Sequence, residues 1–200
     1  MCNLYRMTKP ASEVAAMFGD IAVEIGNAGM EVYPGQPGLV FDGERARSMV
    51  WGFPLSRKGK QGQPLKPKPV NNTRADRVKS FFWRYSFEER RCLLPLTGFA
   101  EAEGPKGGKT RTWISLPDAE LFSVAGIWRE SDEWGPCYSM MMTEACIDMD
   151  GVHDRMPVIL READRARWME GTPSEAYDLC RPWAGALALD RTREPWVLRR

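Results

Sequence analysis

The chain has 200 residues, of which 43% are hydrophobic and 28% are charged, and its net charge is +1. This is the composition of a soluble globular protein, with enough residues for one sizeable core or two small ones. A nearly neutral chain has no global attraction for nucleic acids or membranes, so any phosphate binding must come from a local basic patch. Five cysteines without a C-x-x-C pair do not support a zinc or redox motif, and the single histidine excludes a multi-histidine metal site.

The N-terminal sequence and the cysteines together predict a compartment. The first residues, MCNLYRMTKP, lack the apolar segment of a signal peptide, and no apolar run is long enough to span a membrane. An odd number of cysteines in a chain of this size indicates free thiols, which persist in reducing compartments. We therefore expect a cytoplasmic protein without a membrane partner.

Hydrophobic periodicity and turn residues predict short helices and many short strands. The first helix is expected over residues 8–18, capped near Thr8 or Ser12 and ended by Gly19. Strands are then expected over residues 31–36 (ending in a turn), 39–41, 46–51, 91–96, 99–101, 112–116, 121–128, 137–142 and 157–160. Further helices are expected over residues 76–91, 162–170 and 173–180. This mixture predicts a single α+β domain over residues 1–200, with an antiparallel, barrel-like sheet flanked by short helices.

Two basic segments interrupt the pattern of strands. Residues 56–70 contain five basic residues, no acidic one, and repeated glycine and proline, which predicts a flexible loop. This loop is either a solvated linker or an arm that contacts phosphates. Residues 104–111 form a second flexible basic loop, which is expected to connect the two strands of a hairpin.

Cys2 is the first candidate for chemistry. If Met1 is removed, the Cys2 thiol stands beside a free α-amine. Reference pKa values are about 7.7–8.0 for the amine and about 8.5 for the thiol, so both are expected to be partly nucleophilic near neutral pH. Such an aminothiol reacts with an aldehyde first as an imine and then closes through sulfur to a thiazolidine ring. A cysteine at this position is usually accidental, so position alone carries little weight.

Three other positions have both a structural and a chemical interpretation. Asn72 and Arg74 precede a predicted helix, where they are either a helix cap and a solvated cation or a hydrogen-bonding amide and a phosphate clamp. Glu101 ends an apolar strand, where it is either an exposed edge residue or a proton shuttle in a cavity. His153 has no evident structural role, and imidazole is a natural acid–base group near neutral pH.

Seven short motifs occur in a specific order along the chain. They are M-C-N at 1–3, Y-P-G-Q at 33–36, M-V-W-G-F at 49–53, N-T-R-A-D at 72–76, R-C-L-L-P-L-T-G-F-A-E at 91–101, M-T-E-A-C at 142–146 and H-D-R-M-P-V at 153–158. Each motif is weak alone, but the ordered set resembles the SOS response-associated peptidase (SRAP) family of abasic site processing proteins over residues 2–190.

The resemblance implies a function in DNA repair. It implies a sensor of abasic sites in single-stranded DNA, including single-strand/duplex junctions, that forms a covalent, reversible thiazolidine crosslink through Cys2 once Met1 is removed. The crosslink shields the lesion from strand scission. The resemblance also implies autoproteolytic processing, no cofactor, no metal, and a monomer that associates with the nucleoid when it is bound to DNA.

The resemblance assigns a role to each matching position. Cys2 is the covalent nucleophile, and Asn72 hydrogen-bonds the opened deoxyribose or the terminal amine. Glu101 is the general acid and base for ring opening and imine formation. His153 assists the proton transfers, including those of the reverse reaction that releases the DNA. The implied DNA-binding residues are Arg74 and Arg155 at the flanking phosphates, Trp51 and Pro34 along the DNA groove, and Asn3 and Thr143 beside the active site.

The chain departs from the family pattern around the site. Asp76 stands where the family usually has Glu, and its shorter side chain is expected to weaken an ion pair with a nearby cation. Ala100 and Ala102 stand where aromatic residues usually flank the catalytic Glu, and Leu4 stands where Arg is common. The usual Trp after Pro54 is missing. All four catalytic positions are retained, so we expect the chemistry to be kept and the groove to bind DNA somewhat differently.

Three other functions stay open. An N-terminal-nucleophile amidohydrolase also uses a terminal cysteine with its own α-amine as base. A thiol peptidase would use Cys2 with His153. A non-catalytic protein could bind single-stranded DNA through its aromatic side chains.

Overall fold

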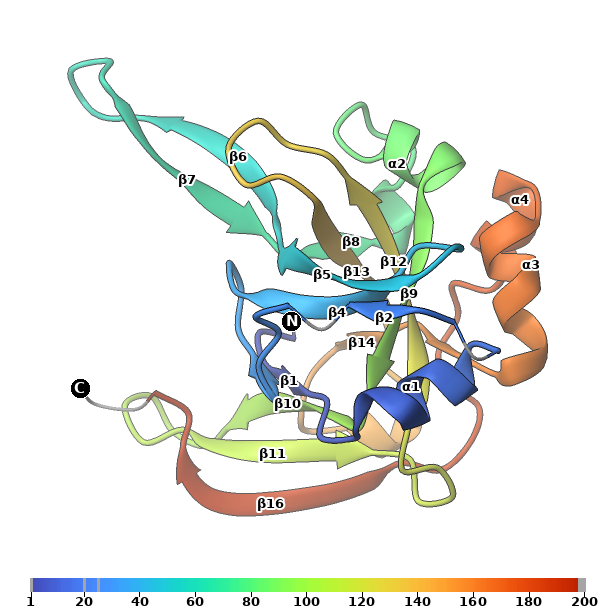
Figure 1. Ribbon diagram of the computed structural model, residues 1–200. Coiled ribbons are helices and arrows are strands. Elements are labelled where there is room, and N and C mark those ends of the chain that lie inside the picture. The colour runs from blue at the N-terminus through green and yellow to red at the C-terminus, as the bar shows by residue number, and fades with distance from the viewer. Residues whose placement is uncertain (1, 20, 25, 198–200) are drawn as a thin grey trace.

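The computed structural model describes residues 2–19, 21–24 and 26–197, and the described strands form two sheets and a separate hairpin (Figure 1). In the first sheet, each strand is antiparallel to its neighbours. The strand order is β16 (Ala188–Pro195), β11 (Thr110–Ser115), β10 (Gly98–Glu103), β1 (Tyr5–Arg6) and β3 (Glu31–Val32).

Five strands of the second sheet close into a barrel. They are β13 (Cys137–Glu144), β12 (Phe122–Arg129), β9 (Arg91–Leu96), β4 (Pro37–Phe41) and β5 (Ala46–Trp51). Neighbours are antiparallel except at the closure, where β5 and β13 pair in parallel. Around the barrel lie β14 (Arg155–Pro157), β15 (Ile159–Leu160), β8 (Asn72–Arg74) and β2 (Val23–Glu24). The predicted α+β class and barrel-like core are confirmed, but the barrel is mixed rather than purely antiparallel.

Alternation along each barrel strand separates two buried faces. In β13, Tyr138 and Met140 point into one core cluster, whereas Cys137 and Met141 belong to the cluster under the helices. Successive side chains of a strand point to opposite faces, and both faces of β13 are covered. This is why β13 has a nearly continuous apolar sequence instead of an alternating one.

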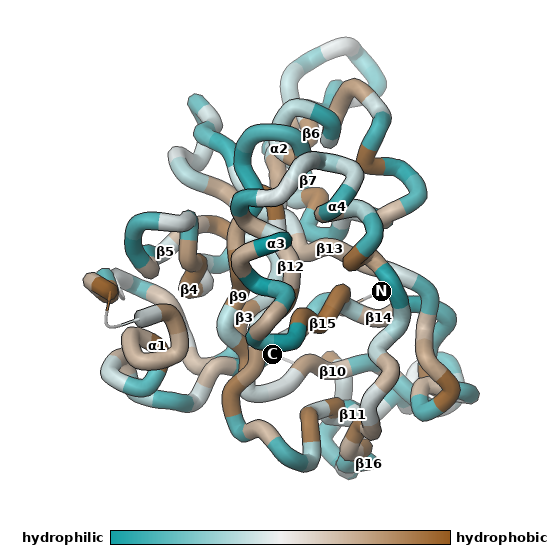
Figure 2. The backbone as a smooth tube through the Cα atoms, turned by 90° about the vertical axis from the view of Figure 1, so that its right-hand side faces the viewer, coloured by the Kyte–Doolittle hydropathy of each residue, from teal (hydrophilic) through white to brown (hydrophobic). Residues whose placement is uncertain are grey.

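Within the described residues, four short α-helices lie on the outside of the sheets. They are α1 (Ala11–Met17), α2 (Arg84–Glu89), α3 (Arg165–Glu170) and α4 (Pro173–Asp178). From α3, Trp168 is buried against the barrel and donates its Nε1–H to the Cys92 carbonyl of β9 at 2.9 Å. Figure 2 views the molecule from this side, with α3 and α4 in front of the strands. None of the described helices is long and apolar enough to cross a membrane.

Several predicted elements differ from the structure at their ends. The first helix begins at Ala11 after Pro10, so neither Thr8 nor Ser12 caps it, although Gly19 follows its end with a positive φ of 90°. The helix predicted over residues 76–91 is a 3-10 turn, Ala75–Arg77, followed later by α2. The strand predicted over residues 157–160 is split between β14 and β15.

The largest difference concerns residues 56–70, which were expected to form a flexible loop. They belong to a hairpin of β6 (Phe53–Lys58) and β7 (Pro64–Val70). A hairpin outside a larger sheet leaves one edge of each strand unpaired, and an unpaired edge tolerates proline because the missing N–H faces away from the partner. Residues 104–109 connect β10 with β11, so the predicted hairpin connection is confirmed there, and the last two residues of that range are already in β11.

Candidate functional site

Cys2 lies between the start of the first sheet and the barrel. Its side chain is fully buried, and its thiol donates to the Leu4 carbonyl at 3.4 Å. Its own carbonyl accepts two hydrogen bonds, from Asn72 Nδ2 at 2.6 Å and from Asn71 Nδ2 at 3.1 Å. The backbone at Cys2 is therefore fixed from the barrel side by two side-chain amides.

Asn72 reaches Cys2 because of its place at the start of β8. This strand pairs in parallel with β13, with Asn72 opposite Met140, and the Asn72 side chain is buried. While its amide nitrogen donates to Cys2, its buried Oδ1 has no hydrogen-bond partner among the described residues. A buried acceptor of this kind is able to accept a hydrogen bond from a hydroxyl or amine group of a bound molecule.

Glu101 approaches the same position from β10. The Ala100 N–H donates to the Leu4 carbonyl at 2.9 Å, which aligns this end of β10 with the chain leading from Cys2 into β1. Glu101 is only 3% exposed, and burial raises the pKa of its carboxyl to about 7. A carboxyl with this pKa is present in both protonation states at neutral pH, as an acid–base catalyst requires.

The Cys2 thiol differs from the sequence-based expectation. Burial raises its pKa well above the usual range, and the nearby Glu101 charge raises it further. At neutral pH the thiol is therefore protonated, not partly ionised as its reference pKa predicted. A reaction through sulfur at this position requires a group that removes the thiol proton during bond formation.

His153 precedes β14 and is half-buried at the edge of the site. Its Nδ1 lies 2.9 Å from the Arg155 N–H and 2.9 Å from the Asp154 carboxylate. Burial lowers the pKa of His153, so the neutral form dominates at neutral pH. The charges of Asp154 and Lys109 act on both His153 and Glu101, so these two acid–base groups share one electrostatic environment.

Arg74 and Arg155 lie on two strands that flank β13. Arg74 pairs with Met142 across one edge of β13, and Arg155 pairs with Glu144 across the other. Asp76 accepts two hydrogen bonds from Arg74, at 2.9 Å and 2.6 Å. Arg74 first, and Arg155 more weakly, lowers the pKa of the Asp76 carboxyl. The shorter Asp76 still pairs with Arg74 through both carboxylate oxygens.

Two residues expected at the DNA surface are not on it. Trp51 is fully buried in the barrel, packs against Tyr5 and Tyr138, and donates its Nε1–H to the Asn71 carbonyl at 2.9 Å. Thr143 is also buried, and its hydroxyl donates to the Cys180 carbonyl at 3.2 Å. Both side chains are buried in this structure, and their assignment to DNA binding stays a prediction. Trp51 shares a core cluster with Cys2 and holds the Asn71 backbone through its Nε1–H.

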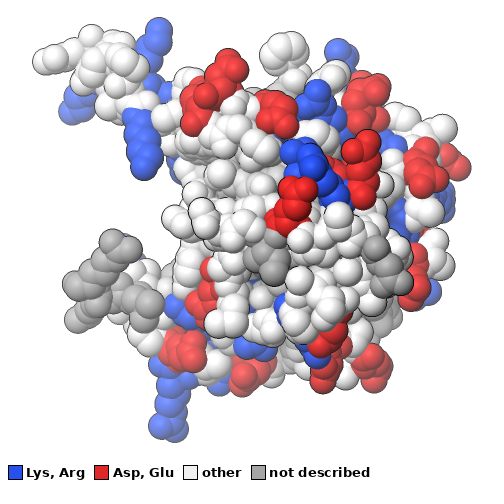
Figure 3. Space-filling model, viewed as in Figure 1, with Lys and Arg blue, Asp and Glu red and all other residues white. Residues whose placement is uncertain are grey.

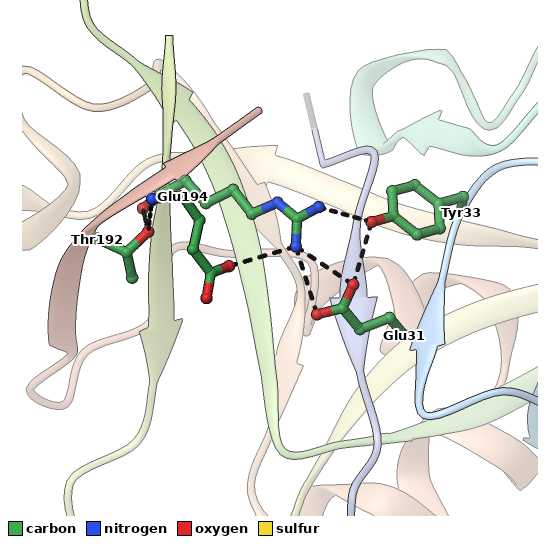
Figure 4. Close-up of polar contacts among 5 residues, drawn as sticks. Glu31, Tyr33, Thr192 and Glu194 are labelled. Carbon is green, nitrogen blue, oxygen red and sulfur yellow. Dashed lines mark hydrogen bonds and ion pairs between the residues drawn. The ribbon is translucent and has the colours of Figure 1, made fainter. Parts of the chain in front are cut away.

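Asn3 and Pro34 share a cavity beside Cys2. This cavity has a volume of about 710 Å³ and also contains Tyr33 and Arg111 in its wall. Figure 4 shows Glu31, Glu194 and the Tyr33 hydroxyl around one guanidinium. That guanidinium is Arg111, which is nearly buried and lies 3.3 Å from Glu31, 3.4 Å from Glu194 and 2.9 Å from the Tyr33 oxygen. Two carboxylates around one cation make this wall unsuited to a phosphate.

Aromatic side chains pack against the residues that depart from the family pattern beside Glu101. Leu4 and Ala100 are buried in one cluster with Trp113, against which Tyr33 and Trp196 also pack. Trp113 lies in β11, and Trp196 directly follows β16. The departures from the family pattern at Leu4 and Ala100 are therefore accompanied by aromatic side chains from neighbouring strands.

Sequence reasoning missed two residues of the site. Asn71 contacts the Cys2 carbonyl together with Asn72, and the N-N doublet at residues 71–72 was the available signal. The positive charge of Lys109 lowers the pKa values of both Glu101 and His153. Its ammonium group donates to the Ala102 carbonyl at 3.4 Å. Only the hairpin between β10 and β11 brings Lys109 close, so local sequence could not indicate it.

Three comparisons relate this chain to known proteins. A family model described as SOS response associated peptidase (SRAP) matches residues 1–193. The abasic site processing protein YoqW of Bacillus subtilis is 28% identical over 142 residues, which are 66% of this chain and 61% of YoqW. The chain therefore aligns with less than two thirds of that relative's length.

Solved structures with a similar fold are also known. A crystal structure of a protein from Bordetella bronchiseptica matches with a TM-score of 0.79 and 19% identity, over 96% of this chain and 99% of that one. A second, from Bacteroides thetaiotaomicron, matches with a TM-score of 0.77 and 19% identity, over 95% and 91% of the two chains. At this identity the likeness establishes the fold alone.

Proposed function

Because the chain belongs to the SOS response associated peptidase (SRAP) family, we propose that it processes abasic sites in single-stranded DNA and joins them covalently through Cys2. The name of YoqW, an abasic site processing protein, supports this substrate. The observation that carries the proposal is the convergence of Asn72 and Glu101 on a buried Cys2.

The proposed reaction requires only groups on the protein and the substrate. Before the reaction with DNA, hydrolysis of the Met1–Cys2 peptide bond consumes one water and releases methionine and the free Cys2 α-amine. The amine adds to the C1′ aldehyde of the ring-opened deoxyribose, and the resulting carbinolamine loses water to form an imine. The Cys2 sulfur then adds to the imine carbon while the thiol proton passes to a base and the nitrogen gains a proton. The product is a thiazolidine, one water is released, and no electron is transferred to an external group.

The proton transfers are assigned to Glu101. In its protonated form it donates to the carbinolamine hydroxyl as water leaves, and in its ionised form it accepts the proton of the Cys2 thiol. The raised pKa of the Cys2 thiol keeps the thiol protonated while the amine forms the imine, so the sulfur reacts second. The raised pKa of Glu101 supports its role as both the acid and the base of these two steps. A neutral His153 at the rim relays protons to solvent and assists the reverse reaction.

Asn72 and the two arginines are assigned to binding. The unpartnered Oδ1 of Asn72 accepts a hydrogen bond from the Cys2 amine or from a hydroxyl of the opened sugar. Arg74 and Arg155, on the two sides of β13, contact phosphates on either side of the lesion. Asn3 and Pro34 contact the nucleotide next to the lesion from the cavity beside Cys2.

A thiol peptidase is less well supported as the main activity. Such an enzyme relies on a thiolate paired with an imidazolium. In this chain burial raises the pKa of the Cys2 thiol and lowers the pKa of His153, so both shifts oppose the ion pair. We assign peptide-bond cleavage only to the removal of Met1.

The proposal is tested with a single-stranded oligonucleotide that contains one abasic site. The processed wild type is expected to give an adduct that survives denaturation. Cys2→Ala, which keeps an α-amine but has no thiol, should give an adduct only when borohydride reduces the imine. Cys146→Ala is the matched control, since Cys146 is a half-buried cysteine close in sequence to His153, and it should react like the wild type. A stable adduct of Cys2→Ala without reduction would remove the sulfur from the mechanism.

A further inference from the structure

The β6–β7 hairpin carries positive charge that the chemistry at Cys2 does not use. It holds five basic residues, all exposed, and residues 56–70 contain no acidic residue. These basic residues are Arg57, Lys58, Lys60, Lys66 and Lys68. Among the described residues none of the five takes part in an ion pair within 4.0 Å. The whole chain has 28 basic and 27 acidic residues, so this concentration of charge is local.

The hairpin is a ribbon that projects from the body of the molecule. Its two strands pair with each other and lie outside both larger sheets (Figure 1). A turn closes its tip, with Gly59 N–H donating to the Gln63 carbonyl at 2.8 Å. Figure 3 shows Lys and Arg side chains on this projection. Unpaired cations on a projecting ribbon provide sequence-independent attraction for a polyanion.

We propose that this ribbon binds the double-stranded DNA that flanks the single-stranded site at Cys2. This inference rests on the proposed function, because it takes DNA as the substrate. It adds a second binding element, outside the reactive site, and assigns it to duplex rather than to single-stranded DNA.

The distribution of side chains favours duplex. Lys68 pairs with Leu55 and lies on one face of the ribbon. Lys58 pairs with Pro64 beyond a register shift and lies on the other face. Cations therefore project from both faces of the ribbon. The major groove is about 12 Å wide, admits a two-stranded ribbon and has phosphates along both walls. Residues 54–80 include no aromatic residue, so the ribbon has no platform on which unpaired bases could stack.

The base of the ribbon is attached to the site itself. β7 leads directly into Asn71 and Asn72, both of which donate to the Cys2 carbonyl. On the other strand, Gly52 precedes β6 with a φ of 127°, and a Cβ there would lie 2.5 Å from the Pro69 Cβ. The two strands are therefore closely paired at the base of the ribbon, next to the residues that hold Cys2, so DNA that leaves the site on this side would meet the ribbon.

The length of the ribbon sets the length of duplex it can cover. β7 has seven residues, and at about 3.3 Å per residue it extends over roughly 23 Å. With a rise of about 3.4 Å per base pair, this corresponds to about seven base pairs. Affinity should therefore increase with the length of the flanking duplex up to about seven base pairs and then level off.

The test compares a variant with all five cations changed to glutamine against the wild type. Fluorescence anisotropy measures affinity for oligonucleotides without an abasic site, either single-stranded or with a ten-base-pair duplex beside the single strand. We expect the variant to lose about 30-fold or more in affinity for the junction at low salt and to reduce its salt slope by about three to four. Its affinity for the single strand should stay within about threefold of the wild type.

Matched variants control for net charge. Lys66→Gln/Lys68→Gln removes two cations from the ribbon, and Arg84→Gln/Arg181→Gln removes two exposed cations near α2 and α4. Lys66→Gln/Lys68→Gln should lower the affinity for the junction more than it lowers the affinity for the single strand. Arg84→Gln/Arg181→Gln should lower the two affinities equally. Equal losses for both pairs, or a five-glutamine variant that binds the junction like the wild type, would overturn the proposal.

Two further measurements separate the possible failures. Binding to vesicles that contain phosphatidylserine is measured for the wild type and the five-glutamine variant. If only vesicle binding is lost, the ribbon binds membranes and the DNA proposal is wrong. Adduct formation on a short single-stranded abasic oligonucleotide is read separately. A wild type without an adduct contradicts the function proposed for Cys2, whereas the affinity measurements on intact DNA still decide the role of the ribbon.

Discussion

The buried carboxyl of Glu101 should make both stability and reactivity depend on pH. Its pKa is raised from an ordinary value of 4.5 to about 7 by burial. A raised carboxyl pKa means that the folded state binds the proton more tightly than the unfolded state. The resulting stability is fully present below pH 4.5 and is lost as pH rises through 7. The difference corresponds to about 3 kcal/mol at pH 8, as an order-of-magnitude value.

Glu101→Gln removes this ionisation and keeps the shape of the side chain. The variant should therefore unfold at higher denaturant concentration than the wild type at pH 8, by up to about 3 kcal/mol, with little difference at pH 4.5. The same variant should form the DNA adduct at least about 100-fold more slowly, because the acid and base are lost. Binding to intact DNA should change much less than adduct formation.

The assays are urea unfolding at the two pH values and single-turnover adduct formation between pH 5 and 9. Glu103→Gln, two residues further along β10, is the control, since Glu103 is partly exposed and contacts Arg191. It should form the DNA adduct at close to the wild-type rate. The reasoning is refuted if the stability difference of Glu101→Gln is the same at both pH values. An equal loss of DNA binding and adduct formation would make Glu101 a structural residue.

The other predictions concern binding, the barrel and the amide at the site. Arg74→Ala should weaken DNA binding and lower the salt slope by about one. Asp76→Asn should strengthen DNA binding about two- to fivefold, because it frees the Arg74 guanidinium that Asp76 now pairs with. An unchanged slope for the first variant removes that side chain from the phosphate contacts. Gly38→Ala should destabilise the fold by about 2–4 kcal/mol in urea unfolding, because its Cβ would lie 1.9 Å and 2.3 Å from two buried tyrosine oxygens. Gly108→Ala, where the added atom meets ordinary contacts at 3.7 Å, should cost less than about 1 kcal/mol. Asn72→Ala should slow imine formation, measured by borohydride trapping, about tenfold or more, and an unchanged rate would contradict its role.

Elements with a strong apolar pattern could be predicted from the sequence. Residues 91–96 were assigned as a strand with the bounds that β9 has in the structure. The physical reason is a continuous apolar run buried on both faces. By contrast, β16 has the sequence ALDRTREP and is mostly exposed, so no hydrophobic period indicated it. Its pairing with β11 depends on backbone hydrogen bonds at a sheet edge.

The β6–β7 hairpin shows a second limit of local sequence. Glycine, proline and lysine are typical of loops, and the segment has no apolar face that requires a sheet. Only the pairing of the two halves across residues 59–63 makes it a ribbon.

The site was predicted by residue type but not by environment. Cys2, Asn72 and Glu101 were named as partners, and the structure brings them together. The protonation state of Cys2 could not be predicted, because the thiol pKa depends on burial by distant segments. The same is true of Trp51, since an aromatic side chain in a strand suits a barrel interior as well as a DNA surface.

The central claim is that the DNA is held by a thiazolidine at Cys2. It is tested most directly by mass spectrometry of the adduct formed between the processed protein and a single-stranded abasic oligonucleotide, without reduction. The expected adduct has a mass one water below the sum of the two components, with the modification on the N-terminal peptide that begins at Cys2. A modification on a lysine, or an adduct in which the Cys2 thiol still reacts with an alkylating reagent after denaturation, would contradict it.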